Sequence, residues 1–260
     1  MRIALIGCGN MGEAVLAGIH KQHKVLVIEP RAERQKELSR KYRCSIGPLD
    51  LAVRQAEVVV LAIKPQDIPE LLAEMRRFDL SKKLLVSIAA GITTAFIGKA
   101  LGQKVRVVRV MPNLPAMIGE GMSGITGGKC AEVGDVKKVE ALFAAIGGTV
   151  IVKEAMIDAV TAVSGSGPAY VFLFAECLMK AARKLGFKEN EARTLVYRTL
   201  LGSAHMLSQS SDSAEVLRQK VTSKGGTTQA ATDVFMRNDI VGMFDKALRA
   251  AKGRAKELSR

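Results

Sequence analysis

The first residues that could support chemistry form a glycine-rich turn near the start of the chain. Gly7, Cys8, Gly9, Asn10, Met11 and Gly12 have GxGxxG spacing, between an apolar strand-like run ending at Ile6 and a helical stretch. There the first glycine permits a tight turn, the second lets a pyrophosphate approach, and the third lets helix and strand pack closely. Free N–H groups at the helix start would hold the diphosphate. This setting favours a dinucleotide site over a purely structural turn.

Charged residues after the next apolar run bear on the choice of dinucleotide. Glu29 occupies the position that binds the adenosine ribose diol, which favours NADH. Arg31 and Arg34 follow at once and would suit a 2′-phosphate, which favours NADPH, although Arg34 fits a solvated helix face equally well. These residues do not decide between NADH and NADPH.

Ala62, Ile63, Lys64 and Pro65 end another apolar run. A doubly wound sheet places its ligand at the carboxyl ends of its strands, so this backbone should line the nicotinamide riboside. Lys64 could be catalytic, could contact the cofactor or could merely precede a helix, and we do not assign it as the acid.

Two more glycine-rich turns lie in the second half. The run 164–170 (SGSGPAY) predicts a helix start that a small ligand can approach, or a simple interhelical turn. The run 222–228 (TSKGGTT) opens another helix and offers several N–H and hydroxyl donors, an arrangement suited to a carboxylate. A helix cap alone would need only one hydroxyl.

Other kinds of site have few residues available. The four cysteines contain no CxxC pair and there are only three histidines, so no metal site is predicted and the thiols are expected to be reduced and structural. No nucleophile stands beside a His–Asp pair. Hydride transfer remains, because there the cofactor carries the reactivity and the protein positions it.

The first half alternates apolar runs, dense in Val, Ile and Leu, with charged amphipathic stretches. This pattern predicts a Rossmann-type, doubly wound parallel sheet with helices on both faces, in a dinucleotide-binding domain over residues 1–154. The expected strands are 2–7, 24–29, 57–63, 84–90, 105–110, 123–126 and 149–152, and the expected helices are 11–21, 31–42, 67–77, 93–101 and 131–146.

From about residue 155 the strand-like runs disappear, and an all-helical domain over residues 155–260 is predicted. Its helices are expected at 155–163, 168–185, 190–209, 214–220, 227–237 and 241–258. Several are apolar around much of their circumference, which predicts burial in a homo-oligomer.

The chain has 260 residues and a net charge of +14, which invites a nucleic-acid partner. The excess is spread along both halves, and aromatic residues make up only 4% of the chain, so platforms for stacking bases are lacking. No uninterrupted apolar run reaches bilayer length, and Gly9, Asn10 and Glu13 break the apolar start of the chain. We expect a cytoplasmic protein with no nucleic-acid or membrane partner.

Six segments resemble pyrroline-5-carboxylate reductases in content and order, over nearly the whole chain. They are MRIALIGCGNMGEAVLAGI, VVVLAIKPQDIPELL, VSIAAGITTAFIGKAL, VRVMPNLPAMIGEGMSGI, AVTAVSGSGPAYVFLFAE and VTSKGGTTQAATDVF. The resemblance implies reduction of 1-pyrroline-5-carboxylate to L-proline by NADPH or NADH, the last step of proline biosynthesis. It also implies a dimer through the helical domain, often assembled into rings of dimers.

The resemblance further implies particular site residues. Cofactor residues fall on Ile6 to Met11, on Ala62 to Pro65, and on Ala89, Ala90 and Gly91; substrate residues fall on Ser223, Gly225, Gly226, Thr227 and Thr228. The Thr228 hydroxyl is expected near the ring nitrogen and is the predicted catalytic group. Lys224 stands where many members have proline, and Ser211 where some have glutamate.

Two other functions are weighed against this one. β-Hydroxyacid dehydrogenases also begin GxGxMG, but the SGSGPAY and SKGGTT turns argue against them. A nicotinamide-binding sensor without turnover would not need a carboxylate turn beside a complete cofactor site.

Overall fold

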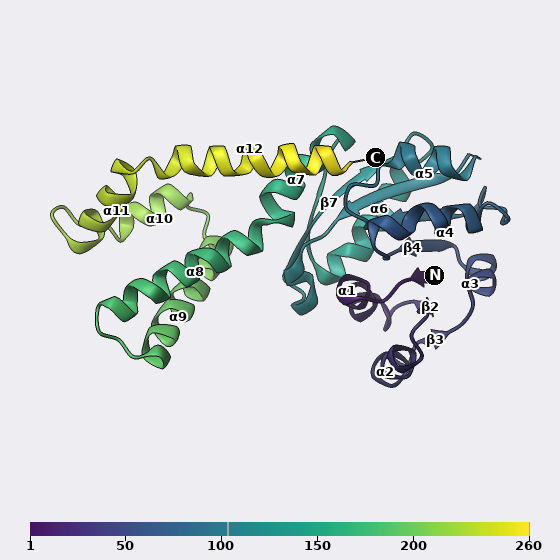
Figure 1. The fold of residues 1–260 in the computed structure, drawn as a ribbon, viewed down its shortest axis with the longest axis horizontal. Helices are drawn as coiled ribbons and strands as arrows, with labels where there is room; N and C mark the ends of the chain where they lie inside the picture. The colour runs from purple at the N-terminus through teal and green to yellow at the C-terminus, as the bar shows by residue number, and fades with distance from the viewer. Residues whose placement is uncertain (103, 260) are drawn as a thin grey trace. The chain divides into compact units, whose positions relative to one another are not determined.

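A sheet with strand order β3-β2-β1-β4-β5-β6-β7-β8 organises the first half of the chain in the computed structural model, which describes residues 1–102 and 104–259 (Figure 1). Neighbouring strands run parallel except β6 and β7, which are antiparallel. The strands are β1 (Arg2–Ile6), β2 (Lys24–Ile28), β3 (Ser45–Ile46), β4 (Val58–Leu61), β5 (Leu84–Ser87), β6 (Arg106–Met111), β7 (Gly121–Gly127) and β8 (Gly147–Ile151).

Helices cover both faces of this sheet, and each face has its own hydrophobic core. One core includes side chains of α1 (Asn10–Ile19), α2 (Ala32–Tyr42) and α6 (Val133–Phe143); the other includes those of α3 (Leu49–Gln55), α4 (Ile68–Met75) and α5 (Thr94–Leu101). Successive strand residues alternate between the cores, as Leu5 and Ile6 do. Burial on both faces explains the uniformly apolar strand sequences. The predicted Rossmann-type sheet is confirmed.

Two elements were missed at the sequence level. β3 has only two residues and α3 only seven, and both are shorter than the sequence window over which hydrophobic periodicity identifies an element. The other elements of the sheet region match their predicted ranges to within three residues, apart from short 3₁₀ turns at Pro65–Asp67, Leu114–Ile118, Ala144–Ile146 and Glu154–Met156.

The break predicted at SGSGPAY is absent. After α7 (Ile157–Val160), residues Thr161–Gly165 form a π-helical turn that leads into α8 (Gly167–Lys184). The Ser166 N–H donates to the Thr161 carbonyl at 2.8 Å, and the Asn113 side-chain amide donates to the Ser164 carbonyl at 3.0 Å. These bonds satisfy carbonyls that the wider turn would otherwise leave unpaired. Glycine and proline therefore reshape the helix here without ending it.

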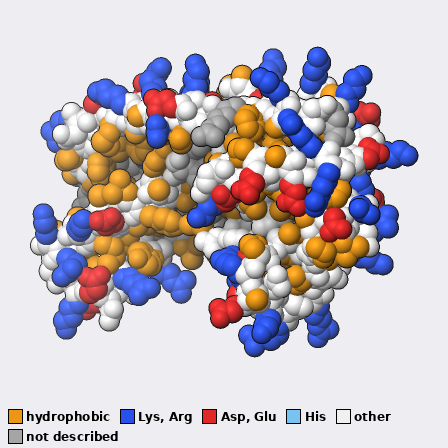
Figure 2. Space-filling model, turned by 45° about the vertical axis from the view of Figure 1, so that its right-hand side comes forward, with side chains coloured by type: hydrophobic (Ala, Val, Ile, Leu, Met, Phe, Trp, Pro, Cys, Tyr) orange, Lys and Arg blue, Asp and Glu red, His pale blue; other side chains and the backbone are white. Residues whose placement is uncertain are grey.

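The remaining helices are α9 (Glu189–Gln209), α10 (Ala214–Lys220), α11 (Thr227–Arg237) and α12 (Ile240–Leu258), which confirms the all-helical second half. Many large apolar side chains of helices α8 to α12 are exposed, including Val171, Phe172 and Phe174 of α8. Figure 2 shows broad clusters of exposed hydrophobic side chains on the molecule. One helical run, Glu154–Lys184, is long and apolar enough to cross a membrane, judged by length and composition alone.

The described chain divides into two compact units, Met1–Pro168 with Ala250–Arg260, and Ala169–Arg249. The helices α8 and α12 each run from one unit into the other. The functional boundary predicted between residues 154 and 155 stays a prediction. Gln103 and Arg260, which fall within the two predicted domains, lie outside the described residues.

Candidate functional site

The glycine-rich turn connects β1 to α1 and has the space that a diphosphate requires. Gly7 has φ +86°, and a Cβ there would lie 2.5 Å from the Ile63 side chain and 2.8 Å from the Ala62 carbonyl oxygen. A Cβ on Gly9 would meet no atom of the described residues within 4 Å. Gly9 is also the N-cap of α1 and supplies no side-chain cap, so the first N–H groups of the helix remain available. The turn therefore fits a bound diphosphate.

The predicted cofactor residues meet at one edge of the sheet. Ile6 is the last residue of β1 and Gly7 to Gly12 follow it. Ala62 to Pro65 follow β4, Ala89 to Gly91 follow β5, and these three parallel strands are neighbours. Pro65, Ala90 and Gly91 line a cavity of about 320 Å³. Asp158 and Thr161 also line it; Thr161 lies within the segment AVTAVSGSGPAYVFLFAE, whereas Asp158 lies just before that segment and belongs to no motif singled out in the sequence.

Glu29 lies just past β2 with its carboxylate buried beneath the turn. Its oxygens accept hydrogen bonds from the Cys8 N–H at 3.3 Å, the Arg31 N–H at 3.1 Å, and the Arg31 Nε and Nη2 at 2.7 and 3.1 Å. Hydrogen bonding from Arg31 holds the pKa of Glu29 below its usual value despite burial. Four donors use the capacity of a carboxylate, so in this conformation Glu29 has no acceptor left for a ribose diol.

The two arginines that follow Glu29 have different surroundings. Arg31 pairs with Glu29 but its side chain is 65% exposed. Arg34 is only 18% exposed; it pairs with Glu13 and Glu37, and its Nε donates to the Cys8 carbonyl at 3.3 Å. Arg34 therefore braces the turn and does not lie on a solvated helix face, whereas Arg31 remains accessible to a ligand.

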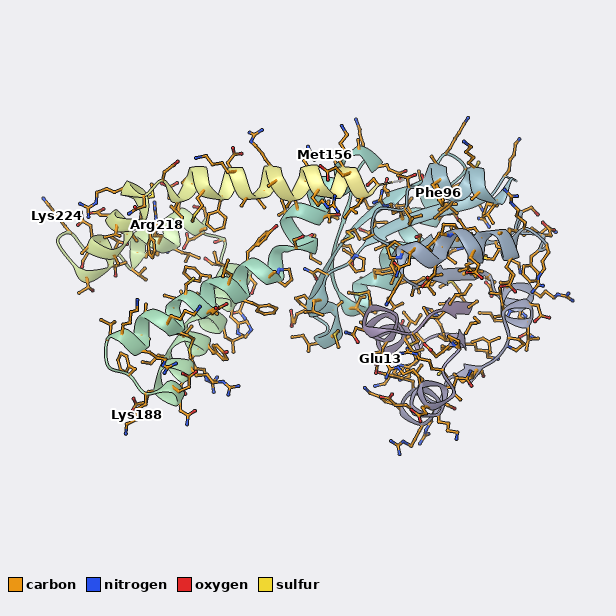
Figure 3. All side chains as sticks on the ribbon, in the orientation of Figure 1. Glu13, Phe96, Met156, Lys188, Arg218 and Lys224 are labelled. Atoms are coloured by element: carbon orange, nitrogen blue, oxygen red, sulfur yellow. The ribbon has the colours of Figure 1, made fainter. Side chains whose placement is uncertain are left out.

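Glu13 links α1 to α2 behind the turn (Figure 3). Its carboxylate pairs with Arg34 and accepts hydrogen bonds at 2.8 Å from both the Lys41 ammonium and the Tyr42 hydroxyl. Burial raises its pKa, but these three donors outweigh burial and lower the pKa of Glu13 to about 2. Burial raises the pKa of the Cys8 thiol to about 12, so this cysteine is a neutral packing residue.

The second glycine-rich region joins α10 to α11, with Lys224 in the turn (Figure 3). Gly225 has φ +74°, which favours glycine, and its N–H donates to the Gln229 side chain at 2.7 Å. Gly226 is the N-cap of α11 and supplies no side-chain cap. In the described chain the hydroxyls of Thr227 and Thr228 have no hydrogen-bond partner. The Gly226 N–H also donates within the turn, to the Ser223 carbonyl at 3.0 Å, so the donors that remain are the N–H groups at the start of α11 and the two threonine hydroxyls.

Comparison with known proteins places this geometry in a family. The family model described as pyrroline-5-carboxylate reductase dimerisation matches residues 154–258, and the model described as NADP oxidoreductase, coenzyme F420-dependent, matches residues 2–91. The pyrroline-5-carboxylate reductase of Haemophilus influenzae is 39% identical, over 98% of this chain and 97% of its own. That of Pseudomonas aeruginosa is 37% identical, over 99% of this chain and 97% of its own.

This chain belongs to the pyrroline-5-carboxylate reductase family. The solved pyrroline-5-carboxylate reductase of Coxiella burnetii has a TM-score of 0.94 and 35% identity, covering 99% of this chain and 98% of its own. The Plasmodium falciparum pyrroline carboxylate reductase was solved with NADP bound. It has a TM-score of 0.86 and 28% identity, covering 100% of this chain and 98% of its own.

Family membership confirms the predicted family and an oxidoreductase that uses NAD(P)H. The dimerisation segment supports the expected self-association. The residue assignments within the site stay predictions.

Proposed function

We propose that this chain carries out the reaction of its family, reduction of 1-pyrroline-5-carboxylate to L-proline, with its cofactor on the glycine turn after β1 and its substrate at the turn before α11. The observation that carries the residue assignment is the pair of glycine N-caps at Gly9 and Gly226. Each begins a helix whose first N–H groups have no side-chain cap, which suits an anion. The diphosphate of the cofactor and the carboxylate of the substrate are the two anions to be held.

The cofactor residues proposed are those of the three strand ends together with Glu29 and Arg31. Backbone donors at Asn10, Met11 and Gly12 bind the diphosphate, and Ala62 to Pro65 with Ala89 to Gly91 border the nicotinamide. NAD(P)H supplies a hydride when bound. Glu29 positions Arg31 and the Cys8 N–H, and Arg31 approaches the adenosine ribose from its exposed side.

The substrate residues proposed are Ser223, Gly225, Gly226, Thr227 and Thr228. The helix-start N–H groups and the Thr227 hydroxyl hold the carboxylate. The Thr228 hydroxyl orients the ring nitrogen, which gains a proton as the neighbouring carbon is reduced. Because this hydroxyl has no partner within the described chain, it can bind substrate without first breaking an internal hydrogen bond.

The assembly proposed is a dimer through residues 154–258, with rings of dimers as the larger form. The same segment contains the apolar run Glu154–Lys184. Contact with a partner chain would remove its apolar side chains from water, so a membrane is not needed to bury them. We therefore propose a cytoplasmic enzyme with no membrane or nucleic-acid partner.

The test is an assay of the purified protein with 1-pyrroline-5-carboxylate and NADPH or NADH, following loss of the reduced cofactor and formation of proline. We expect turnover with the pyrroline and none with a β-keto acid. Reduction of the β-keto acid alone would indicate a β-hydroxyacid dehydrogenase. Cofactor binding without turnover of either substrate would indicate a sensor.

A further inference from the structure

A cleft of about 530 Å³ lies at the amino ends of β1 and β2. The glycine turn follows the carboxyl end of β1, so the cleft and the cofactor site are at opposite ends of the same strand. The cleft forms because β3 is so short that it pairs only with Leu26 and Val27, leaving the start of β2 without a neighbour on that side. Residues from α3 and from the ends of α1 and α2 complete its walls.

The charged side chains that line this cleft are all basic or imidazole groups. They are Arg2, His20, His23, Lys24 and Arg43, and the lining contains no Asp or Glu. The carboxylate of Glu57 pairs with Arg2 at 3.8 Å, but Lys24 and Arg43 have no ion pair in the described part of the chain. Cations that converge on a concave surface repel one another unless an anion enters.

Two local features suggest that the cleft is built for a ligand. Arg43 has φ +51° at the C-cap of α2, a left-handed position where glycine is the usual residue. Arg43 occupies this position although its backbone is strained there, and it is one of the basic residues that line the cleft. The Nδ1 atom of His23 is buried and has no hydrogen-bond partner among the described residues. The His23 nitrogen is therefore a buried polar atom that a ligand could pair with.

We propose that this cleft binds a small organic phosphate with an apolar body, at a site separate from the cofactor site. Apolar side chains such as Ile3, Val25 and Ile46 provide surface for the body. The unpaired charges of Lys24 and Arg43 match a phosphate monoester dianion better than the single charge of a carboxylate. The volume is within the range of small-molecule sites.

The experiment measures phenyl phosphate binding to the full-length protein by calorimetry, with NADP⁺ at saturation to occupy the cofactor site. We expect binding, and a loss of affinity of at least about tenfold in Arg43→Gly and in Lys24→Ala. Arg43→Gly removes the guanidinium without straining the backbone, because glycine suits the left-handed conformation, so the melting temperature should not fall. Arg40→Ala, an exposed change on the same helix outside the cleft, should bind as the parent does.

Inorganic phosphate and benzoate separate the contributions of the charge and the apolar body, and both should bind more weakly than phenyl phosphate. The proposal is overturned if the parent protein does not bind phenyl phosphate, if NADP⁺ abolishes binding, or if Arg43→Gly binds unchanged. It is also overturned if Arg40→Ala weakens binding equally or if benzoate binds more tightly. None of these variants touches the proposed catalytic machinery, so reduction of the pyrroline should stay at the parental rate in all of them.

Discussion

Part of the acid stability of the fold should come from the carboxylate of Glu13, which joins α1 to α2. Its side chain is 15% exposed, and its partners lower its pKa from 4.5 to about 2. Because the folded pKa is below the unfolded one, this contribution to stability is complete above about pH 4.5 and is lost as the pH falls through about 2. Glu13→Gln imitates the protonated state at every pH.

The pKa difference sets the size of the effect. At about 1.4 kcal/mol per pKa unit, the Glu13 carboxylate contributes at most roughly 3 kcal/mol to the free energy of unfolding. Because the side chain is partly exposed, we expect Glu13→Gln to lower the free energy of unfolding by about 2 kcal/mol near neutral pH. Urea unfolding of the parent and Glu13→Gln proteins, at one protomer concentration and several pH values, measures the loss. The difference between them should shrink steadily below about pH 4.5.

Glu37→Gln is the matched control, because Glu37 also pairs with Arg34 but its side chain is 49% exposed. Glu37→Gln should lower the free energy of unfolding by less than about 1 kcal/mol. A Glu13→Gln loss that is equal at pH 6 and pH 3, or no larger than that of Glu37→Gln, would refute the reasoning from this network.

Four further outcomes are expected. Arg31→Ala should lower kcat/KM for NADPH more than for NADH, by roughly tenfold or more in their ratio, and an unchanged ratio would remove Arg31 from the adenosine site. Thr228→Ala should lower kcat/KM for the pyrroline by about 5- to 150-fold, equivalent to roughly 1–3 kcal/mol, with the Kd for NADPH unchanged; a lower Tm with normal kinetics would make Thr228 merely structural. Gly7→Ala should abolish NADPH binding, measured by cofactor fluorescence, because its Cβ would lie 2.5 Å from the Ile63 side chain. Phe172→Glu should shift sedimentation toward the 27.9 kDa protomer, and an unchanged assembly would place Phe172 outside the interface.

The sheet and its order of elements could be predicted because buried parallel strands carry their own signal. Val58–Leu61 is fully buried, and its composition shows this directly. The π-helical turn at Thr161–Gly165 could not be predicted in the same way. It depends on Asn113, 51 residues from the carbonyl it binds, and no local pattern contains that contact.

The site shows the same limit at Glu29. Its position after β2 suggested a ribose ligand, and the sequence placed it correctly beside the glycine turn. Its partners were not predictable, because the Cys8 N–H lies 21 residues away and competes with any ligand for the same oxygens. Arg31 is the alternative that the sequence offers at this site, and its exposed guanidinium makes it the better candidate for contact with the cofactor.

The proposed binding turns begin their helices with a glycine N-cap, whereas α2, α3 and α4, which also lack a side-chain cap, begin with Arg31, Pro48 and Asp67. α5 and α10 begin with Thr93 and Ser213, whose hydroxyls accept the N–H groups of Phe96 and Val216. A side-chain cap of this kind stabilises a helix by about 1 kcal/mol. The helices α1 and α11 lack this side-chain cap, because their N-cap residues Gly9 and Gly226 have no side chain. Donors left unpaired in the protein alone are the donors that a diphosphate or a carboxylate can use, so these two helix starts give up local stability in a way that favours ligand binding.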